Sequence, residues 1–426
     1  MAWIVRGEFR KLWVGQLVSA SGTAITTVAL PLVAVVTLQA SAVEMGVLAA
    51  LTVLPHLVFG LPAGMWVDRW SLRRVLVVTD VGRAVLLGCI PLSAAVGALA
   101  IWQLYVVAVL TGVLTLVSET ASMTLVPALV RRDDLIRANS AYLLNLNVAS
   151  TAGPSVAGLL VQVVTAPFAI VFDAASYVVS AVASYLIREP RRTSAGRSRG
   201  RLTAGLRVLF GSPVLAPLAV SATVGAVAGS LQGPLIVLYL VRELHWAPAL
   251  VGVAITAFGV AAVVGSLVAP AWIRLVGIGR GYLTGQFVAS LTGAALAVGF
   301  APFVLLGQAL SGLGMSLFAV PQRTLRQSLV PPGSLGRVSA TWRTLVVGGQ
   351  SLGALTSGVL ATALGLRATL LISTIGMLAA TLIAVLSPLR TLHSLPETAP
   401  LDGGPAVFSP RRGGRPFRRW TRRGRR

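Results

Sequence analysis

Five ionisable side chains lie inside long apolar runs of this 426-residue chain, where charge is costly. A charged group inside a bilayer is unfavourable and by default marks a proton or ion pathway. A carboxylate there can carry a proton or attract a cation, and a histidine exchanges a proton near neutral pH. The five are Asp80, Arg83, Glu119, Asp173 and His56.

Asp80 and Arg83 are three residues apart, so on a helix they share one face and can form an ion pair. Side chains tilt toward the N-terminus of a helix, which lets Arg83 reach back toward the cytoplasm. We expect this pair to be structural and continuous with the charged segment that precedes it. Neither Asp173 nor Glu119 has a basic neighbour in sequence.

Asp173 and Glu119 could therefore carry a proton or attract a cationic solute. The alternative is a carboxylate hydrogen-bonded to nearby hydroxyls, for Asp173 those of Ser176 and Tyr177. His56 follows Pro55 in the middle of its apolar run, and it could exchange protons or form an interhelical hydrogen bond.

The elements that position these groups must be membrane-spanning helices. The chain is 55% hydrophobic and only 11% charged, with a mean hydropathy of +0.84, which indicates an integral membrane protein. A span needs roughly 20 apolar residues. Twelve runs qualify: 13–38, 43–66, 75–99, 102–124, 139–163, 167–187, 213–240, 248–272, 282–301, 303–322, 343–364 and 367–388.

The net charge of +23 is distributed by topology rather than for nucleic-acid binding. If the N-terminus is cytoplasmic, all 35 Lys and Arg residues lie on the cytoplasmic side except Arg83, Arg242 and Arg367. This is a positive-inside pattern. It predicts a multi-pass protein of the inner (plasma) membrane with both termini in the cytoplasm.

The chain divides into two halves of six spans each. We expect an N-terminal half at 1–188, a basic linker at 189–211, a C-terminal half at 212–392 and a tail at 393–426. The tail is rich in Pro, Gly and Arg, which predicts disorder and contact with anionic lipid headgroups. The lipid bilayer, not nucleic acid, is the expected partner of these charges.

A charged segment after the second run has a faint copy in the second half. Gly64-x3-Asp68-Arg69-x3-Arg73-Arg74 is echoed by Gly265 to Arg274, with Ala269 where the aspartate would stand. Further on, several residues recur at an offset of 200. Parallel repeats imply a twofold pseudo-axis along the membrane normal and a substrate cavity between the halves. The recurring residues are Arg137, Gly153, Gly158 and Leu160, matched by Arg337, Gly353, Gly358 and Leu360.

These motifs resemble the major facilitator superfamily, and in particular its twelve-helix drug exporters related to macrolide efflux pumps and the enterobactin exporter. The resemblance covers nearly all of residues 10–390. It is carried by the segment 64–74 and by four others: Leu129-Val-x4-Leu135-Ile-Arg-Ala138-Asn139, Gly153-Pro154-x2-Ala157-Gly158, Asp173-Ala-Ala-Ser-Tyr177 and Gly336-Arg337-Val338.

The resemblance implies an all-α fold of two pseudo-symmetric six-helix bundles and a gating latch. In the family the loop after the second helix joins the halves on the cytoplasmic side. Carried over, Asp68 would pair with Arg73 or Arg74 and with the start of the eleventh span, near Trp342 and Arg343. The alternative is that the arginines only fix topology. The latch candidates are Gly64, Asp68, Arg69, Arg73, Arg74 and Arg274.

Gly153, Pro154 and Gly158 resemble the signature of exporters in this superfamily, although the family has a glycine where this chain has Ala157. Small residues here should let the fifth span pack closely on the eighth. Ordinary helix packing explains the same residues. The resemblance implies a monomer that exports small hydrophobic or amphipathic compounds and uses the proton gradient, with no cofactor. Proton coupling is inherited from the family, because 102–123 lacks the arginine of many proton-driven exporters.

Polar residues in the first, fifth, seventh and eleventh spans are weaker candidates for lining the cavity, because such groups also hold helices together. They are Gln16, Ser19, Asn145, Asn147, Gln232 and Gln350. The sequence has no ATP-binding loop, metal cluster or nucleophile–base pair, so we do not expect an enzyme. A dedicated exporter of one siderophore or secondary metabolite, and a non-transporting receptor or scaffold, stay open as alternatives.

Overall fold

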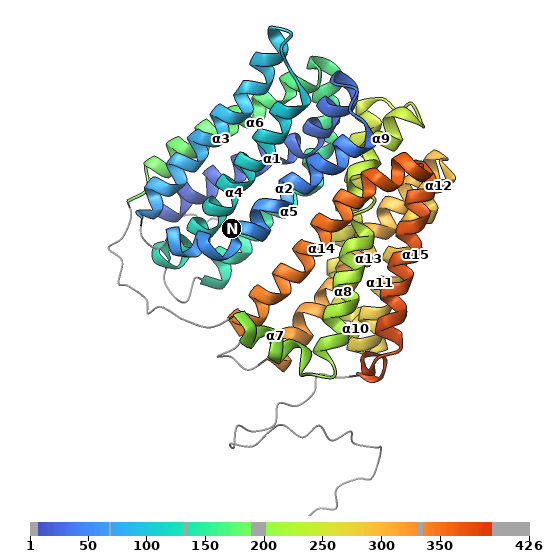
Figure 1. Ribbon diagram of the computed structural model, residues 1–426. Helices are drawn as coiled ribbons and strands as arrows, with labels where there is room; N and C mark the ends of the chain where they lie inside the picture. Colours follow the sequence, from blue (N-terminus) through green and yellow to red (C-terminus); the bar gives the residue numbers. More distant parts are fainter. Residues whose placement is uncertain (1–6, 68–69, 131–134, 189–201, 331–334, 394–426) are drawn as a thin grey trace, which may run out of the picture.

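The computed structural model describes residues 7–67, 70–130, 135–188, 202–330 and 335–393, and its N-terminal half is a bundle of long helices (Figure 1). The first helix continues into a π-helical turn, η1, at Val33–Thr37. The helices are α1 (Glu8–Leu32), α2 (Ala42–Val67), α3 (Leu72–Ala95), α4 (Ile101–Leu129), α5 (Leu135–Val164) and α6 (Ala166–Tyr185).

The C-terminal half repeats this bundle with two of its spans interrupted. The seventh span is α8 (Leu215–Gly229) followed by α9 (Gly233–Arg242), and the ninth is α11 (Ile278–Ser290) followed by α12 (Thr292–Val298). A short helix in the expected linker, α7 (Leu202–Phe210), was not predicted. The rest are α10 (Pro248–Val276), α13 (Ala301–Leu329), α14 (Leu335–Leu364), α15 (Leu366–Val385) and the 3₁₀ turn η4 (Pro388–Thr391).

The predicted all-α membrane architecture is confirmed. Eleven helices of the described chain are long and apolar enough to cross a membrane, and α5 contributes a shorter apolar stretch at Val148–Val164. The helices extend beyond the apolar runs: α4 continues to Leu129, and α13 continues to Leu329 through last turns that are amphipathic. Hydropathy thus finds the spans but not the ends of the helices.

The two ends of the molecule differ in charge. At one end, called the basic end here, α1, α3 and α5 begin and α2, α4 and α6 finish. Lys11 at the start of α1 donates to the Leu186 carbonyl after α6 at 2.7 Å. At the other end, called the opposite end, Arg367 at the start of α15 binds Glu243 after α9 at 3.2 Å.

The two halves repeat in two numerical registers. Helices α13, α14 and α15 begin at residues 301, 335 and 366, each 200 after the starts of α4, α5 and α6. Even the unusual backbone before α6 recurs, with φ of 70° at Thr165 and 88° at Gly365. Helices α10 and α11 begin at 248 and 278, each 206 after the starts of α2 and α3. The offset of 200 predicted for the later helices is therefore confirmed.

The copy of the charged segment was assigned to the wrong register. A Cβ on Gly112 of α4 would lie 3.4 Å from the Thr52 carbonyl oxygen of α2, and Gly312 of α13 contacts the carbonyl oxygen of Phe258 in α10 in the same way. Thr52 and Phe258 are 206 apart, so Gly64 corresponds to Pro270 rather than Gly265. The same count puts Arg274 at the position of Asp68. Isolated Gly and Trp matches misled the alignment.

The halves meet through glycines near the opposite end. A Cβ on Gly46 of α2 would lie 2.7 Å from the Ala354 carbonyl oxygen of α14, and one on Gly158 of α5 would lie 2.5 Å from the Pro248 carbonyl oxygen of α10. Absence of a side chain lets the backbones approach closely. The halves are thus joined by two seams, α2 with α14 and α5 with α10, which lie side by side in Figure 1.

Candidate functional site

The predicted ion pair between Asp80 and Arg83 is present and buried at the centre of the N-terminal half. The two side chains are 0% and 7% exposed. Asp80 also accepts a hydrogen bond from the Ser180 hydroxyl of α6 at 2.8 Å, and Arg83 donates to Ser118 of α4 at 3.1 Å. A buried ion pair whose other donors and acceptors form hydrogen bonds in this way can hold α3, α4 and α6 together.

Tyr177 of α6 extends this network to α1. The Arg83 guanidinium lies over the Tyr177 ring, 4.1 Å from its centroid, and donates to its hydroxyl at 3.4 Å. The same hydroxyl is 2.7 Å from the Thr23 hydroxyl of α1. The partners described for Arg83 lie on α3, α4 and α6, so the expected continuity with the segment 64–74 is not what these contacts show.

Asp173 is sealed between α6 and α1, with 1% of its surface exposed. Its carboxylate accepts from the Ser176 hydroxyl at 3.2 Å, as the hydrogen-bonding alternative predicted. A Cβ on Gly22 of α1 would lie 2.6 Å from the same carboxylate, so only glycine fits there. A carboxylate so enclosed is placed to bind helices together rather than to meet a solute.

His56 and Glu119 lie close to each other in the structure, a pairing that was not predicted from the sequence. Nε2 of His56 on α2 is 3.9 Å from Oε2 of Glu119 on α4. The side chains are 29% and 50% exposed. The side chains of His56 and Glu119 are therefore partly exposed, whereas those of Asp80, Arg83 and Asp173 are buried.

The latch can be followed only in part, because Asp68 and Arg69 lie outside the described residues and only the helical backbone of Gly64 is described. Arg73 lies 5.3 Å over the ring of Tyr185, joining the start of α3 to the end of α6. Arg74 donates its backbone N–H to the Ser71 hydroxyl at 3.3 Å, a helix N-cap, and its side chain is exposed.

The expected partners of the latch in the C-terminal half lie at the start of α14 and near the end of α10. Trp342 of α14 is buried, and the Arg326 guanidinium lies 4.8 Å from the centroid of its ring. Arg343 and Arg274 are exposed at the basic end. Both arginine side chains are therefore accessible at this end.

The exporter motif packs as predicted. Gly158 lies against Pro248, Ala249 and Gly252 of α10, and Gly252 in turn faces the Pro154 carbonyl oxygen. Gly153 packs on Ala24 of α1 rather than on the other half. Among the described contacts, the hydroxyls of Ser155 and Thr256 form a hydrogen bond across this seam at 2.7 Å. The motif thus builds the α5–α10 seam between the halves.

Residues 1–413 match the family described as transmembrane secretion effectors. The chain belongs to this family. It is therefore a membrane transporter of the major facilitator superfamily and not an enzyme. A match over nearly the whole chain, with two six-helix halves, leaves the fold and class of the protein settled.

Similar proteins agree with this assignment. The multidrug efflux pump Tap of Mycolicibacterium fortuitum is 27% identical over 399 residues, which cover 90% of this chain and 96% of Tap. The enterobactin exporter EntS of Citrobacter koseri is 24% identical over 410 residues, covering 92% of this chain and 96% of EntS.

Solved structures share the fold. A bacterial homologue of the iron transporter ferroportin, in an inward-facing state, aligns with a TM-score of 0.73 at 17% identity and covers 88% of this chain and 97% of its own. A mutant of the nucleoside transporter NupG aligns with a TM-score of 0.75 at 11% identity, over 89% of this chain and 99% of its own.

Three of the six polar residues proposed to line the transporter's cavity form hydrogen bonds between its helices. Gln16 donates to Ser122 of α4 at 3.4 Å, Asn145 to the Trp13 carbonyl at 3.0 Å, and Gln232 to Ser373 at 2.6 Å. Ser19 is buried and donates within α1. Gln350 is half-buried on α14, and the side chain of Asn147 lies outside the described residues.

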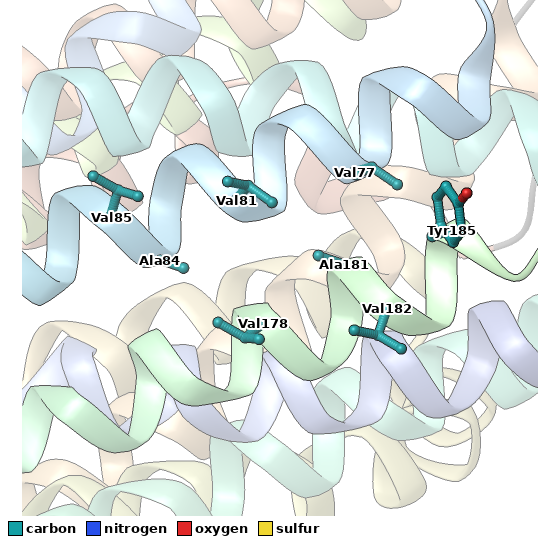
Figure 2. Close-up of a pocket in the computed structure, with 8 residues that line it drawn as sticks. All are labelled: Val77, Val81, Ala84, Val85, Val178, Ala181, Val182 and Tyr185. Atoms are coloured by element: carbon teal, nitrogen blue, oxygen red, sulfur yellow. The ribbon is translucent and has the colours of Figure 1, made fainter.

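An apolar groove between α3 and α6 is not a site for a polar solute. Figure 2 shows its lining of valine and alanine side chains, with Tyr185 at one end. Val81 and Val178 on its walls are 47% and 53% exposed. Exposed valines along two membrane-spanning helices indicate a surface that faces lipid.

Proposed function

We propose that this transporter exports small hydrophobic or amphipathic compounds from the cytoplasm, by alternating access coupled to proton antiport. The observation that carries the proposal is the family match over residues 1–413, joined to two bundles that meet through glycine seams at one end. Relatives named as a multidrug efflux pump and a siderophore exporter support outward transport of such compounds.

The basic end is assigned to the cytoplasm of the cell membrane by the positive-inside rule. Arg10, Lys11, Arg73 and Arg74 lie there, whereas the opposite end carries Arg242 and Arg367. Both termini are then cytoplasmic, and the Arg-rich tail lies on anionic lipid headgroups. The functional unit is a monomer, because each bundle finds its partner within the chain.

This orientation supports a transport cycle. The α2–α14 and α5–α10 seams then lie on the outer side and close it, as expected of an inward-facing state. Rocking the bundles about these seams would open the outer side and close the cytoplasmic one. Asp68 would then act in the cytoplasmic latch, with Arg73, Arg74 and the start of α14 as its expected partners.

A dedicated siderophore exporter is the second candidate function, because EntS matches over 92% of this chain. The two functions differ in breadth. A drug pump transports many unrelated amphipathic compounds, whereas a dedicated exporter transports one chemical class. The same assay separates them when its panel contains a catecholate siderophore beside cationic and neutral drugs.

The test is efflux of this panel from cells that lack their own pumps and express the chain, with and without a protonophore. We expect several drugs to leave faster than from control cells, and the protonophore to abolish the difference. Efflux that survives collapse of the proton gradient would remove the coupling. A protein that inserts in the membrane yet exports nothing would contradict the function. A matched control is a cell line expressing the insertion-competent variant Gly46→Leu, whose side chain would collide with α14 at the seam.

A further inference from the structure

His56 and Glu119 differ in their exposure from Asp80, Arg83 and Asp173, the other ionisable groups predicted to lie within the N-terminal spans. Asp80, Arg83 and Asp173 are nearly fully enclosed, whereas Glu119 is 50% exposed and His56 29%. The 3.9 Å separation is longer than a hydrogen bond. The carboxylate is therefore paired by charge but not locked by a direct bond.

His56 lies on the side of α2 that faces the other half. Its neighbours in sequence mark the two flanking helices: Pro55 packs on Gly112 of α4, and Leu57 is 3.7 Å from the Cβ position of Gly348 on α14. Leu54 and Val58 are 38% and 53% exposed, and they lie about 160° around the helix from His56. They mark the lipid-facing side, so His56 points away from lipid.

Glu119 faces the same space from α4. It is two helical turns after Gly112, whose face packs on α2, so the two residues share that face. Val106 and Leu110, which are 46% and 44% exposed, lie about 140–180° away around α4 and mark its lipid-facing side. The exposed half of Glu119 therefore opens between the bundles and not into the bilayer.

Few other charges face this pair. On α3, Asp80 and Arg83 are turned to the other side of α4 and bonded to Ser118 and Ser180. The charged side chains described on α1 lie at the basic end, where Glu8 pairs with Lys11, and Arg242 of α9 lies at the opposite end. The charged residue described on α14 nearest to Gly348 is Arg343, five residues toward the basic end. Among the charged side chains that the structure describes, none therefore faces this pair on the inter-half face.

The surroundings of the carboxylate suit an apolar cation. Met123, one turn after Glu119, is 64% exposed. A thioether side chain adapts to bulky apolar ligands and makes favourable contacts with aromatic rings. A hydrophilic cation would gain little from this side chain, whereas an aromatic or alkylated one would bury its surface on it.

We propose that Glu119 and His56 form the site at which this transporter exchanges a lipophilic organic cation for a proton. This inference rests on the proposed export function and names its substrate class and coupling site. With His56 protonated, the imidazolium is the counter-ion of Glu119. When a cation pairs with Glu119, the imidazolium loses its N–H proton to water and becomes neutral. One positive charge enters the site and one proton leaves it.

The reverse exchange completes the cycle on the outer side. There a proton from the periplasmic face returns to the imidazole, restores the ion pair with Glu119 and expels the cation. Because both groups lie on one rigid bundle, the pair itself survives rocking of the halves, and only the side to which it is open changes. Exchange at one pair is sufficient for antiport of one cation against one proton.

The experiment measures binding of tetraphenylphosphonium to the purified full-length protein by titration calorimetry, at about one pH unit below and above the ordinary histidine pKa of about 6.5. If the protonated histidine competes with the cation, the Kd falls about tenfold across this interval. Triphenylphosphine oxide, which has a similar shape and no charge, should bind with the same Kd at both pH values.

Variants assign the two roles. We expect His56→Gln to bind the cation with one Kd at both pH values, equal to that of the wild type at the higher pH. Glu119→Gln should bind it at least about tenfold more weakly at the higher pH while keeping affinity for the uncharged compound. Glu243→Gln, which removes a carboxylate paired with Arg367 outside the site, should match the wild type.

The inference is overturned if wild-type binding is absent or independent of pH, if Glu119→Gln binds the cation normally, or if His56→Gln keeps the pH dependence. Failure of the export function has a different signature: wild-type cells that export nothing although the purified protein binds the cation in the predicted way. Efflux of tetraphenylphosphonium at the wild-type rate by Glu119→Gln cells would sink the exchange site while leaving export intact.

Discussion

The seam between α2 and α4 in the N-terminal half and the seam between α10 and α13 in the C-terminal half are built on one plan. In each, a glycine on the later helix, Gly112 or Gly312, rests on a backbone carbonyl of the earlier one. Counted in the registers of the repeat, the residues that correspond to His56 and Glu119 are Ala262 and Ala319. The same backbone packing is thus achieved without ionisable groups.

The interiors of the halves differ in the same way. Gln286, Ala289 and Met377 stand where the N-terminal half has Asp80, Arg83 and Tyr177. The C-terminal interior is held by neutral bonds instead, such as Ser221 to Tyr282 at 3.0 Å and to the Ala380 carbonyl at 2.8 Å. Because the fold is satisfied by neutral residues at these positions, packing does not demand charge. We infer that the ionisable groups that act in transport lie in the N-terminal half, and that the C-terminal half repeats the same packing with neutral residues.

The largest expected effect comes from breaking the buried pair. Asp80→Gln introduces the residue found at the corresponding position, 286, and leaves Arg83 buried without its counter-ion. Loss of one partner of a buried pair costs about 3–5 kcal/mol. The thermal unfolding temperature of the purified variant should fall sharply.

Replacing both partners by their counterparts, Asp80→Gln with Arg83→Ala, should recover most of that loss because no uncompensated charge remains. A single Asp80→Gln variant that melts at the wild-type temperature would show that the two interiors do not differ in the way described.

A smaller effect is expected at the contact between α1 and α6. The glycine of this contact lies on the earlier helix in the N-terminal half and on the later helix in the C-terminal half. Gly22 of α1 faces Ser176 of α6, whereas the corresponding residues are Ala228 and Gly376, which also touch. Gly22→Ala should cost about 1–3 kcal/mol through overpacking against Ser176 and Asp173. Adding Ser176→Gly should restore part of the stability, which a double-mutant cycle measures as a coupling energy.

The control is Gly229→Ala, whose Cβ would meet only the Met377 sulfur at an ordinary 3.7 Å. Equal destabilisation by Gly22→Ala and Gly229→Ala, or additive effects of Gly22→Ala and Ser176→Gly in the double-mutant cycle, would argue against a close contact between Gly22 and Ser176.

The smallest effect concerns the hydrogen bond between the Ser155 and Thr256 hydroxyls across the α5–α10 seam. Thr256→Val removes the partner of Ser155 at nearly constant volume, which should weaken the seam by about 1 kcal/mol. If the seam opens in each cycle, the initial rate of efflux should change by a factor of about five or less. Thr27→Val, which removes a hydroxyl bonded only within α1 in the described contacts, serves as the control. Unchanged rates in both variants would mean that this bond does not hold the seam.

Residues close in sequence were predictable, and contacts between distant helices were not. The pairing of Asp80 with Arg83 follows from their spacing on one helix, and the spans follow from hydropathy. His56 and Glu119 lie on different helices, and no local pattern links them. The tail was predicted to be disordered, but 394–426 lie outside the described residues.

The register error has the same origin. The glycines of the second half align with the first in more than one way by sequence, because Gly and Ala are frequent in membrane helices. The starts of the helices, and the contacts of Gly112 with Thr52 and of Gly312 with Phe258, fix the offset at 206 for α2 and α10. The breaks that separate α8 from α9 and α11 from α12 were not predicted either, although Gly229, Ser230 and the Gly233-Pro234 step mark the first of them.

The most direct test of the account counts protons. Tetraphenylphosphonium is added to the purified protein in weakly buffered solution at about one pH unit below the ordinary histidine pKa of about 6.5, and the pH is recorded. We expect about one proton released per cation bound by the wild type. The double variant His56→Ala with Glu119→Ala, which carries the residues of the C-terminal seam, should release none while keeping the wild-type melting temperature. No release from the wild type, or the same release from the double variant, would contradict the assignment of the ionic chemistry to this seam.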